Sequence, residues 1–343
     1  MQGMIKIADV ASAAKVSPST VSRALTRPEM VARETRERVL LAARQLGYHP
    51  NKLARGLRKR RSHLLGLIVG DILAPFHATL AKGVQDAAEK HGYVVFLFNS
   101  DEQPEKEARY LQELQSHLIE GLLIVPTAKT RQHLRSLPSV RELPIIELDR
   151  TSGTPGVHAV LVENVLGARG AVEHLIQLGH RRIGMVAGEP VITTAQERLE
   201  GYRQALEQAG LPFDERLVAN GYHKEEGGYA AAMELLRRPP AERPTALFVG
   251  NSEMAAGTVQ AIRDLGLRIP EQISLVSFDD TRWAQLMEPA LTVVAQPAYE
   301  IGFLACEALV SLLQRRKPLQ SHTLRLKTRL LIRQSTARPY EGD

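Results

Sequence analysis

The stretch IADVASAAKVSPSTVSRAL, residues 7–25, predicts two short helices joined by a tight turn. In its first part, apolar residues recur at the spacing of one helix face: Ile7, Val10, Ala11 and Ala14. Lys15 and Val16 form the turn. Ser17 is a good N-cap for the next helix, and Pro18 suits its first position because the missing N–H of proline would have no partner there.

The rest of the N-terminal region completes a three-helix unit. The second helix buries the face formed by Val21, Ala24 and Leu25. A third helix fits residues 34–46, with Gly47 as its C-terminal cap and an inward face of Val39, Ala42, Ala43 and Leu46. Three short helices with small residues at their contacts are typical of a helix-turn-helix DNA-binding domain.

The second helix is expected to enter the DNA major groove by its N-terminal end. Pro18, Ser19 and Arg23 would then meet base edges, and arginine is the usual bidentate partner of guanine. Hydroxyl groups near the helix start are better placed for phosphates: Ser17, Thr20 and Ser22. The simpler alternative for each residue is an exposed polar side chain, and for Ser17 alone capping is the better explanation.

Positive charge is concentrated in the first part of the chain. Residues 1–62 hold 14 of the 44 Lys and Arg and 4 of the 38 Asp and Glu, a net charge of +10, whereas the remainder carries −4. This distribution is typical of a nucleic-acid binder. The segment NKLARGL, residues 51–57, is interpreted as a basic hinge. A solubilising surface or a disordered basic tail is the alternative, but neither would carry the helical pattern described above.

The overall composition is that of a globular chain of two or three domains, with 343 residues, 44% hydrophobic and 24% charged. Cys306 is the single cysteine, which excludes an intramolecular disulfide and a cysteine-based zinc site. A buried helical position explains Cys306 better than a reactive thiol does. The first residues lack the apolar core of a signal peptide, and no apolar run approaches the ~18 residues of a membrane helix. We therefore expect a cytoplasmic protein, associated with the nucleoid when bound to DNA.

Residues 64–335 alternate between short apolar runs and amphipathic helices. The runs predict buried parallel strands at 64–69, 94–98, 122–125, 145–148, 183–187, 246–249 and 275–278. Helical patterns intervene at 78–91, 109–118, 166–178, 196–209 and 255–265. The alternation predicts an α/β, doubly wound parallel fold, and two such sets in sequence predict two similar subdomains.

A ligand cleft is expected between these subdomains, because open parallel sheets bind ligands beyond the carboxyl ends of their strands. The residues just past those ends are the candidates: Asp71, Phe76, Asn99, Asp101, Asp149, Arg150, Arg198, His223, Asn251 and Asp279. Carboxylates and amides bind hydroxyl groups, and an aromatic face covers a sugar ring. Asp149 and Asp280 could equally cap helices.

Several segments resemble those of the lactose/galactose repressor (LacI) family of bacterial regulators. They are Asp9-Val10-Ala11, Val16-Ser17, Thr20-Val21-Ser22-Arg23, TRERV at 35–39, LGY at 46–48, Pro50-Asn51 and LARGL at 53–57, and the resemblance continues to about Arg333. It implies a homodimer on a palindromic operator and a segment, residues 51–58, that becomes helical only on DNA. The implied DNA contacts of this segment are Asn51, Ala54, Arg55 and Leu57. Leu57 would wedge into the central minor-groove step, although a plain hydrophobic contact is the alternative.

The same resemblance implies a periplasmic-binding-protein-like effector domain and assigns roles in its cleft. Arg198, within ERLEGY at 197–202, matches the effector-binding arginine. Asn251 and Asp279 match a pair that binds hydroxyl groups, and Phe76 and His223 occupy ring-stacking positions.

The chain departs from the family pattern at several points. Lys15 stands where the family has a turn glycine, and a residue other than glycine at positive φ costs about 1 kcal/mol. Lys6 and Ala32 replace the usual polar caps. In the cleft, Ser252 follows Asn251 where an Asn-Asp pair is usual, and Ala74 precedes Pro75-Phe76 where Asn is usual. His223 stands where many family members carry tryptophan or phenylalanine. A histidine with Arg150 and Arg198 suits a sugar acid or a sugar phosphate as well as a neutral sugar.

Two other functions are less compatible with the sequence. There is no P-loop, dinucleotide fingerprint, nucleophile elbow or metal motif, so we expect neither an enzyme nor a cofactor. A sugar-binding protein of transport, or a sensor without specific operator binding, would not require the basic helix-turn-helix.

The predicted function is therefore a ligand-responsive repressor, with the effector as inducer or corepressor left open. Its predicted domains are 1–50 for DNA binding, 51–62 for the hinge and 63–343 for the effector. The N-subdomain is expected to span 63–162 and 293–320, and the C-subdomain 163–292 and 321–335. The C-terminal residues show no leucine heptads, so a dimer is favoured over a tetramer.

Overall fold

The computed structural model describes residues 5–48, 62–116, 119–137, 143–315 and 322–339. The chain divides into two compact units, residues 1–62 and 63–343, which are considered one at a time. The hinge residues Asn51, Ala54, Arg55 and Leu57 lie outside the described residues. Among the helices that the structure describes, none combines the length and apolar character needed to span a bilayer.

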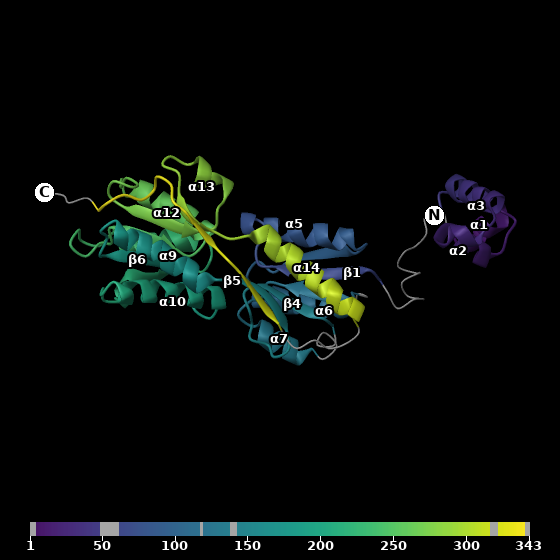
Figure 1. The fold of residues 1–343 in the computed structure, drawn as a ribbon, viewed down its shortest axis with the longest axis horizontal. Coiled ribbons are helices and arrows are strands. Elements are labelled where there is room, and N and C mark those ends of the chain that lie inside the picture. Colours follow the sequence, from purple (N-terminus) through teal and green to yellow (C-terminus); the bar gives the residue numbers. More distant parts are fainter. Residues whose placement is uncertain (1–4, 49–61, 117–118, 138–142, 316–321, 340–343) are drawn as a thin grey trace. The chain divides into compact units, whose positions relative to one another are not determined.

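The N-terminal unit contains α1 (Ile7–Ala13), α2 (Pro18–Thr26), the 3-10 turn η1 (Pro28–Met30) and α3 (Arg33–Leu46) (Figure 1). Val10, Val21 and Val39, one from each α-helix, are fully buried together. The predicted helices and their inward faces are thus confirmed, because each apolar stripe is buried against the other two.

Local capping defines the ends of these helices. The Thr20 N–H donates to Ser17 Oγ at 3.2 Å, which satisfies one of the free donors at the start of α2. Gly47 ends α3 with a φ of +64°. The Asp9 carboxylate accepts from the Lys6 N–H at 2.7 Å, so α1 keeps a side-chain cap although Lys6 cannot supply one. Lys15, which stands where a turn glycine is usual in the family, has a φ of +53°.

The N-subdomain is built on a sheet in the order β11-β5-β4-β3-β1-β2. Its strands are β1 (Leu64–Val69), β2 (Val94–Asn99), β3 (Gly121–Ile124), β4 (Ile145–Asp149), β5 (His158–Val162) and β11 (Thr323–Leu326), all paired in parallel. Its helices are α5 (Pro75–Lys90), α6 (Pro104–Ser116), α7 (Thr130–Ser136) and α14 (Ala298–Arg315). Figure 1 shows α14 lying along α5. A Cβ on Gly83 would lie 2.1 Å from the Tyr299 carbonyl oxygen, so glycine permits this close approach.

The C-subdomain repeats the architecture with the sheet order β12-β10-β9-β8-β6-β7. Its strands are β6 (Ile183–Ala187), β7 (Val218–Asn220), β8 (Ala246–Val249), β9 (Ser274–Phe278), β10 (Thr292–Ala295) and β12 (Arg329–Leu331), of which β12 is antiparallel to β10. Its helices are α9 (Asn164–Gln177), α10 (Thr193–Gln208), η2 (Glu215–Leu217), α11 (Glu225–Leu236), α12 (Ser252–Asp264) and α13 (Arg282–Leu286). The predicted doubly wound α/β fold with two subdomains is confirmed.

The chain crosses between the subdomains three times: after β5, after β10, and between β11 and β12 (Figure 1). The sheet order gives subdomain boundaries that differ from the expected ones. β10 belongs to the C-subdomain sheet because it pairs with β9, and β11 belongs to the N-subdomain sheet because it pairs with β5. Each of these two strands is four residues long, too short for a periodic signal in the sequence.

The expectation that residues 94–98 form a buried strand is wrong. β2 is the edge strand of its sheet, and Val94, Phe96 and Leu97 are 54%, 39% and 46% exposed. An apolar run cannot distinguish a strand covered by its own chain from one left at an edge. Cys306, by contrast, is buried on α14 as expected, and burial raises the pKa of its thiol to about 12.

Candidate functional site

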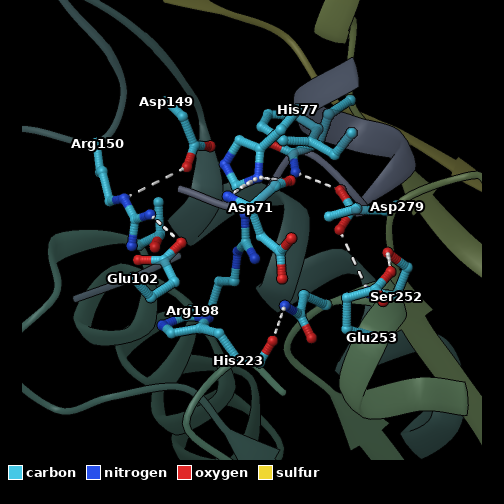
Figure 2. Close-up of a pocket in the computed structure, with 15 residues that line it drawn as sticks. Asp71, His77, Glu102, Asp149, Arg150, Arg198, His223, Ser252, Glu253 and Asp279 are labelled. Carbon is cyan, nitrogen blue, oxygen red and sulfur yellow. Dashed lines mark hydrogen bonds and ion pairs between the residues drawn. The ribbon is translucent and has the colours of Figure 1, made fainter. Parts of the chain in front are cut away.

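A pocket lies between the two subdomains, at the carboxyl ends of strands of both sheets (Figure 2). The N-subdomain side is lined by Asp71, Ala74, Phe76, His77, Glu102, Asp149 and Arg150. The C-subdomain side is lined by Thr194, Arg198, His223, Asn251, Ser252, Glu253 and Asp279, and Gln296 comes from the crossing after β10. The sequence-predicted ligand residues Asp71, Phe76, Asp149, Arg150, Arg198, His223, Asn251 and Asp279 are therefore brought together here. The cavity is narrow, about 50 Å³.

Left-handed turns place these side chains at the ends of their strands. Asp101, Glu102, Asp149, Tyr222, His223 and Asp279 all have φ between +51° and +74°. Positive φ is unfavourable for residues other than glycine, and such residues cluster at functional sites. The backbone of both subdomains thus turns sharply at the pocket.

An ion pair occupies one wall. The Arg150 guanidinium lies 2.5 Å from Glu102 Oε1 and 4.0 Å from Asp149 Oδ2. Burial would raise the pKa of Glu102, but Arg150 outweighs this and holds that pKa at about 2. Burial likewise opposes the charge of Arg150, yet Glu102 and Asp149 raise its pKa. Both groups stay charged at neutral pH.

Arg198 is fixed at the opposite wall. Its Nε donates to Asn164 Oδ1 at 2.9 Å, its Nη1 donates to the Gly250 carbonyl, and its guanidinium lies 3.9 Å from the centre of the Phe278 ring. Only 4% of the residue is exposed. The side chain is held rigidly before any ligand arrives, which lowers the entropic cost of binding.

Four pocket atoms are buried without a hydrogen-bond partner among the described residues. They are His77 Nε2, Asp149 Oδ1, Arg150 Nε and Gln296 Oε1. Buried polar groups are normally paired, so unpaired ones mark a place where a ligand or water supplies the partner. Burial also raises the pKa of Asp149, which a donating hydroxyl group would counteract.

The remaining predicted residues are partly committed to the scaffold. Asn251 accepts from the Met254 N–H at 2.9 Å as the N-cap of α12, and donates to the His223 carbonyl at 3.3 Å. Asp279 accepts from Gln296 Nε2 at 2.5 Å and from the Ser252 N–H at 3.3 Å. Burial lowers the pKa of His223 to about 3, so its ring is neutral at physiological pH. Its Nε2 accepts from the Glu189 N–H at 3.2 Å.

The charge of the pocket is unbalanced toward carboxylates. Five carboxyl groups line it, against two guanidinium groups. The guanidinium of Arg150 is paired with Glu102, and that of Arg198 is bonded to Asn164 and Gly250. The arrangement offers hydrogen-bond acceptors to a ligand that carries several hydroxyl groups.

Sequence reasoning missed several lining residues. His77 lies on α5, and Gln296 follows β10, a strand of four residues. Glu102 lies in the left-handed turn after β2. Two further candidates do not line the pocket: Asn99 accepts from the Ile72 N–H at 3.1 Å, and Asp101 binds Lys106 and Lys224. The lining residues that were missed lie far apart along the chain, so no local sequence pattern marks them as parts of one site.

The predicted DNA-contacting residues lie at the start and on the outer face of α2. Ser17, Pro18, Ser19, Ser22 and Arg23 are exposed, and Thr20 is half-buried. Ser17 Oγ lies 2.8 Å from Ser19 Oγ and 2.9 Å from Thr20 Oγ1. The hydroxyl groups are thus gathered at one helix N-terminus, where backbone N–H groups favour an anion.

Comparison with known proteins agrees with both units. A model described as bacterial regulatory proteins, lacI family, matches residues 6–51, and one described as a periplasmic binding protein-like domain matches residues 172–336. The ribose operon repressor of Halalkalibacterium halodurans is 33% identical and covers 97% of this chain and 97% of its own.

Two solved structures are similar along the chain. The lac repressor dimer bound to operator and the anti-inducer ONPF is 27% identical, with a TM-score of 0.84 over 98% of this chain and 100% of that chain. A LacI family transcriptional regulator from Enterococcus faecium with bound ribose is 29% identical, with a TM-score of 0.73 over 81% of this chain and 100% of that chain.

Proposed function

Because the chain belongs to the lacI family of bacterial regulatory proteins, we propose that it is a transcriptional repressor whose affinity for a palindromic operator is controlled by a sugar effector. The observation that carries this proposal is the presence, in one chain, of a basic helix-turn-helix and a cleft with unpaired polar groups. The protein acts on DNA and so works in the cytoplasm, on the nucleoid when it is bound.

For DNA binding, we propose that α2 lies in the major groove with Ser19 and Arg23 at base edges. Ser17, Thr20 and Ser22 hold phosphates. The hinge contacts Asn51, Ala54, Arg55 and Leu57 complete the interface, with Leu57 in the minor groove. These assignments rest on the exposure of the α2 residues and on the resemblance of the hinge sequence.

For assembly, we propose that the edge strand β2 contributes to the homodimer interface. Val94, Phe96 and Leu97 place apolar side chains on the surface of a strand that ends its sheet. Exposed apolar side chains on an edge strand are a hazard for a monomer and an ordinary feature of a subunit interface. A second copy that covers this strand would bury it.

For the effector, we propose a neutral sugar. The excess of carboxylates disfavours a sugar acid or phosphate, because Arg150 is already paired with Glu102 and His223 is uncharged. Arg150 Nε, which has no hydrogen-bond partner among the described residues, can donate to the oxygen of a neutral hydroxyl group. Asp149 Oδ1 and Gln296 Oε1 are acceptors for hydroxyl groups, and Phe76 offers a ring face. Ribose is the first sugar to test, since one relative is named for the ribose operon and one similar structure holds ribose.

The effector changes DNA affinity only to the extent that it prefers one arrangement of the two subdomains. Bound in the cleft, it contacts both subdomains at once and so favours their closed arrangement. That arrangement in turn determines whether two hinges of a dimer can meet in the minor groove.

The first experiment selects bound duplexes from a random DNA pool, with and without ribose, and titrates the protein calorimetrically with ribose, ribose 5-phosphate and gluconate. We expect an enriched palindrome whose yield changes with ribose, and heat only from the neutral sugar. Asp149→Asn should weaken ribose binding about tenfold, whereas Asp214→Asn, at an exposed pair with Arg216, should not. Ribose binding without an enriched DNA sequence would indicate a sensor without specific operator binding.

A further inference from the structure

A lysine joins the two subdomains at the edge of the pocket. Lys224 lies in the turn between β7 and α11 of the C-subdomain, directly after the pocket residue His223. Its Nζ lies 2.8 Å from Asp71 Oδ2 and 2.9 Å from Asp101 Oδ1, and both aspartates belong to the N-subdomain. One ammonium group therefore bridges two carboxylates across the cleft.

The bridge and the pocket share the same strained turns. On one side, Tyr222 and His223 have φ of +51° and +64° and lead directly into Lys224. On the other side, Asp101 and Glu102 have φ of +55° and +57°. Asp101 binds Lys224, and the next residue, Glu102, binds Arg150. Each turn thus presents one residue to the bridge and one to the pocket, which couples their positions.

Lys224 and Asp101 both stay charged at physiological pH. Hydrogen bonds from Lys224 and Lys106 lower the pKa of Asp101. Burial opposes the charge of Lys224, but Asp71 and Asp101 outweigh it and raise its pKa. The Lys224 side chain is 37% exposed, so dissolved salt reaches the bridge and weakens it.

We propose that Lys224 is a positioning residue that latches the cleft closed through Asp71 and Asp101 and thereby sets the affinity for the effector. The idea rests on the proposed function for the identity of the ligand, but the latch itself is a property of the subdomains. Two other contacts also join the subdomains: an ion pair from Arg325 Nη2 on β11 to Glu197 Oε1 on α10 at 2.7 Å, and an uncharged hydrogen bond from the Thr151 N–H to Thr193 Oγ1 at 3.1 Å.

The chain offers a matched control. Lys106 also binds Asp101, at 3.1 Å, and its side chain is 35% exposed. Both members of that pair lie in the N-subdomain, so it does not cross the cleft. Removing Lys106 deletes an equivalent charge and an equivalent ion pair without releasing the two subdomains from each other.

The affinity test titrates Lys224→Met and Lys106→Met with D-ribose. We expect the Kd of Lys224→Met to rise about 3- to 10-fold, as two partly exposed ion pairs predict, and that of Lys106→Met to stay within about twofold. Lys224→Arg, which keeps a positive charge between Asp71 and Asp101, should retain most of the affinity. Equal effects of the two single variants, or no effect of either, would overturn the latch.

A second test needs no ligand. Spin labels on Gln112→Cys and Glu234→Cys, at exposed positions of α6 and α11, report the distance between the subdomains, and Cys306 is buried away from the label. Lys224→Met should shift the distribution to longer distances. Raising salt from about 0.05 to about 0.5 M should shift the unsubstituted protein the same way, and by more than it shifts Lys224→Met, which keeps the Arg325–Glu197 pair. If ribose fails to bind but the distances shift, the ligand assignment is wrong and the latch stands. If the distances do not shift, the latch is wrong.

Discussion

The helix-turn-helix and the cleft organise function in opposite ways. In α2 the residues that hold the fold and the residues assigned to DNA lie on different faces: Val21 and Ala24 are buried, whereas Ser19, Ser22 and Arg23 point outward. In the cleft the same side chains serve both purposes, since Arg198 binds scaffold atoms and Asp279 binds Gln296. A helix surface therefore separates folding from recognition, and a junction of strand ends does not.

The largest effect that tests this contrast is expected at Arg198. Arg198→Met should abolish the response to ribose and also lower the free energy of unfolding by about 3 kcal/mol, because Asn164 and the Gly250 carbonyl lose a buried donor. Chemical denaturation and calorimetric titration measure the two losses.

Arg203 supplies the control for this substitution. It lies on the same helix and its guanidinium lies 4.3 Å from the Phe213 ring centre, but it is exposed. Arg203→Met should cost less than about 1 kcal/mol and leave the ribose response intact. If Arg198→Met lost the response at unchanged stability, folding and recognition would be separable in the cleft after all.

The second effect is expected at Arg23, where a substitution should weaken operator binding without changing the stability of the fold. Arg23→Ala should weaken operator binding by about 1–3 kcal/mol and relax one base position, while the unfolding transition stays within about 0.5 kcal/mol. Arg33→Ala removes the same charge from an exposed site on α3, and only a small, sequence-independent loss is expected there. A fall in stability with Arg23→Ala would show that α2 also mixes the two roles.

The third effect concerns the pH dependence of the cleft. The pKa of His223 falls from 6.5 when exposed to about 3 in the folded protein. As pH falls below about 6.5, the unfolded chain takes up the proton and the folded chain does not, so stability decreases by up to about 1.4 kcal/mol per pH unit. Glu102, whose pKa is about 2, acts in the same direction but only below its ordinary value of 4.5.

His223→Asn isolates this contribution. The difference in unfolding free energy between the unsubstituted protein and His223→Asn, measured from pH 7 to pH 5 (outside the range in which Glu102 titrates), should change steadily with pH. A difference that does not vary with pH would mean that His223 is accessible to protons in the fold. The helix-turn-helix has no comparably buried histidine among its described residues, so this acid sensitivity should belong to the cleft.

The contrast also explains what could be predicted from the sequence. The ends of α2 were predictable because Ser17, Pro18 and the Val21 face are local signals within nine residues. β1, β6 and β8 were predictable because they are short, wholly buried apolar runs. Glu102 and Gln296 were not, because their places depend on where β2 and β10, far apart in the sequence, end in space. No local pattern encodes this. The exposure of β2 depends on the sheet order, which is likewise a property of the whole fold.

The smallest effect is expected within the helix-turn-helix, at its two left-handed residues. Gly47 has a φ of +64° and a Cβ there would meet nothing within 4 Å, so Gly47→Ala isolates backbone strain and should cost about 1 kcal/mol. Lys15 has a φ of +53°. Lys15→Gly relieves similar strain but gives the unfolded chain more freedom, so its net effect should stay below about 0.5 kcal/mol. Thermal unfolding of the two variants measures both.

A gain near 1 kcal/mol for Lys15→Gly would mean that the turn is held against its preference by the burial of Val10 and Val21. In that case the local signals would explain less of this unit than its packing does, and the difference between the two regions would narrow.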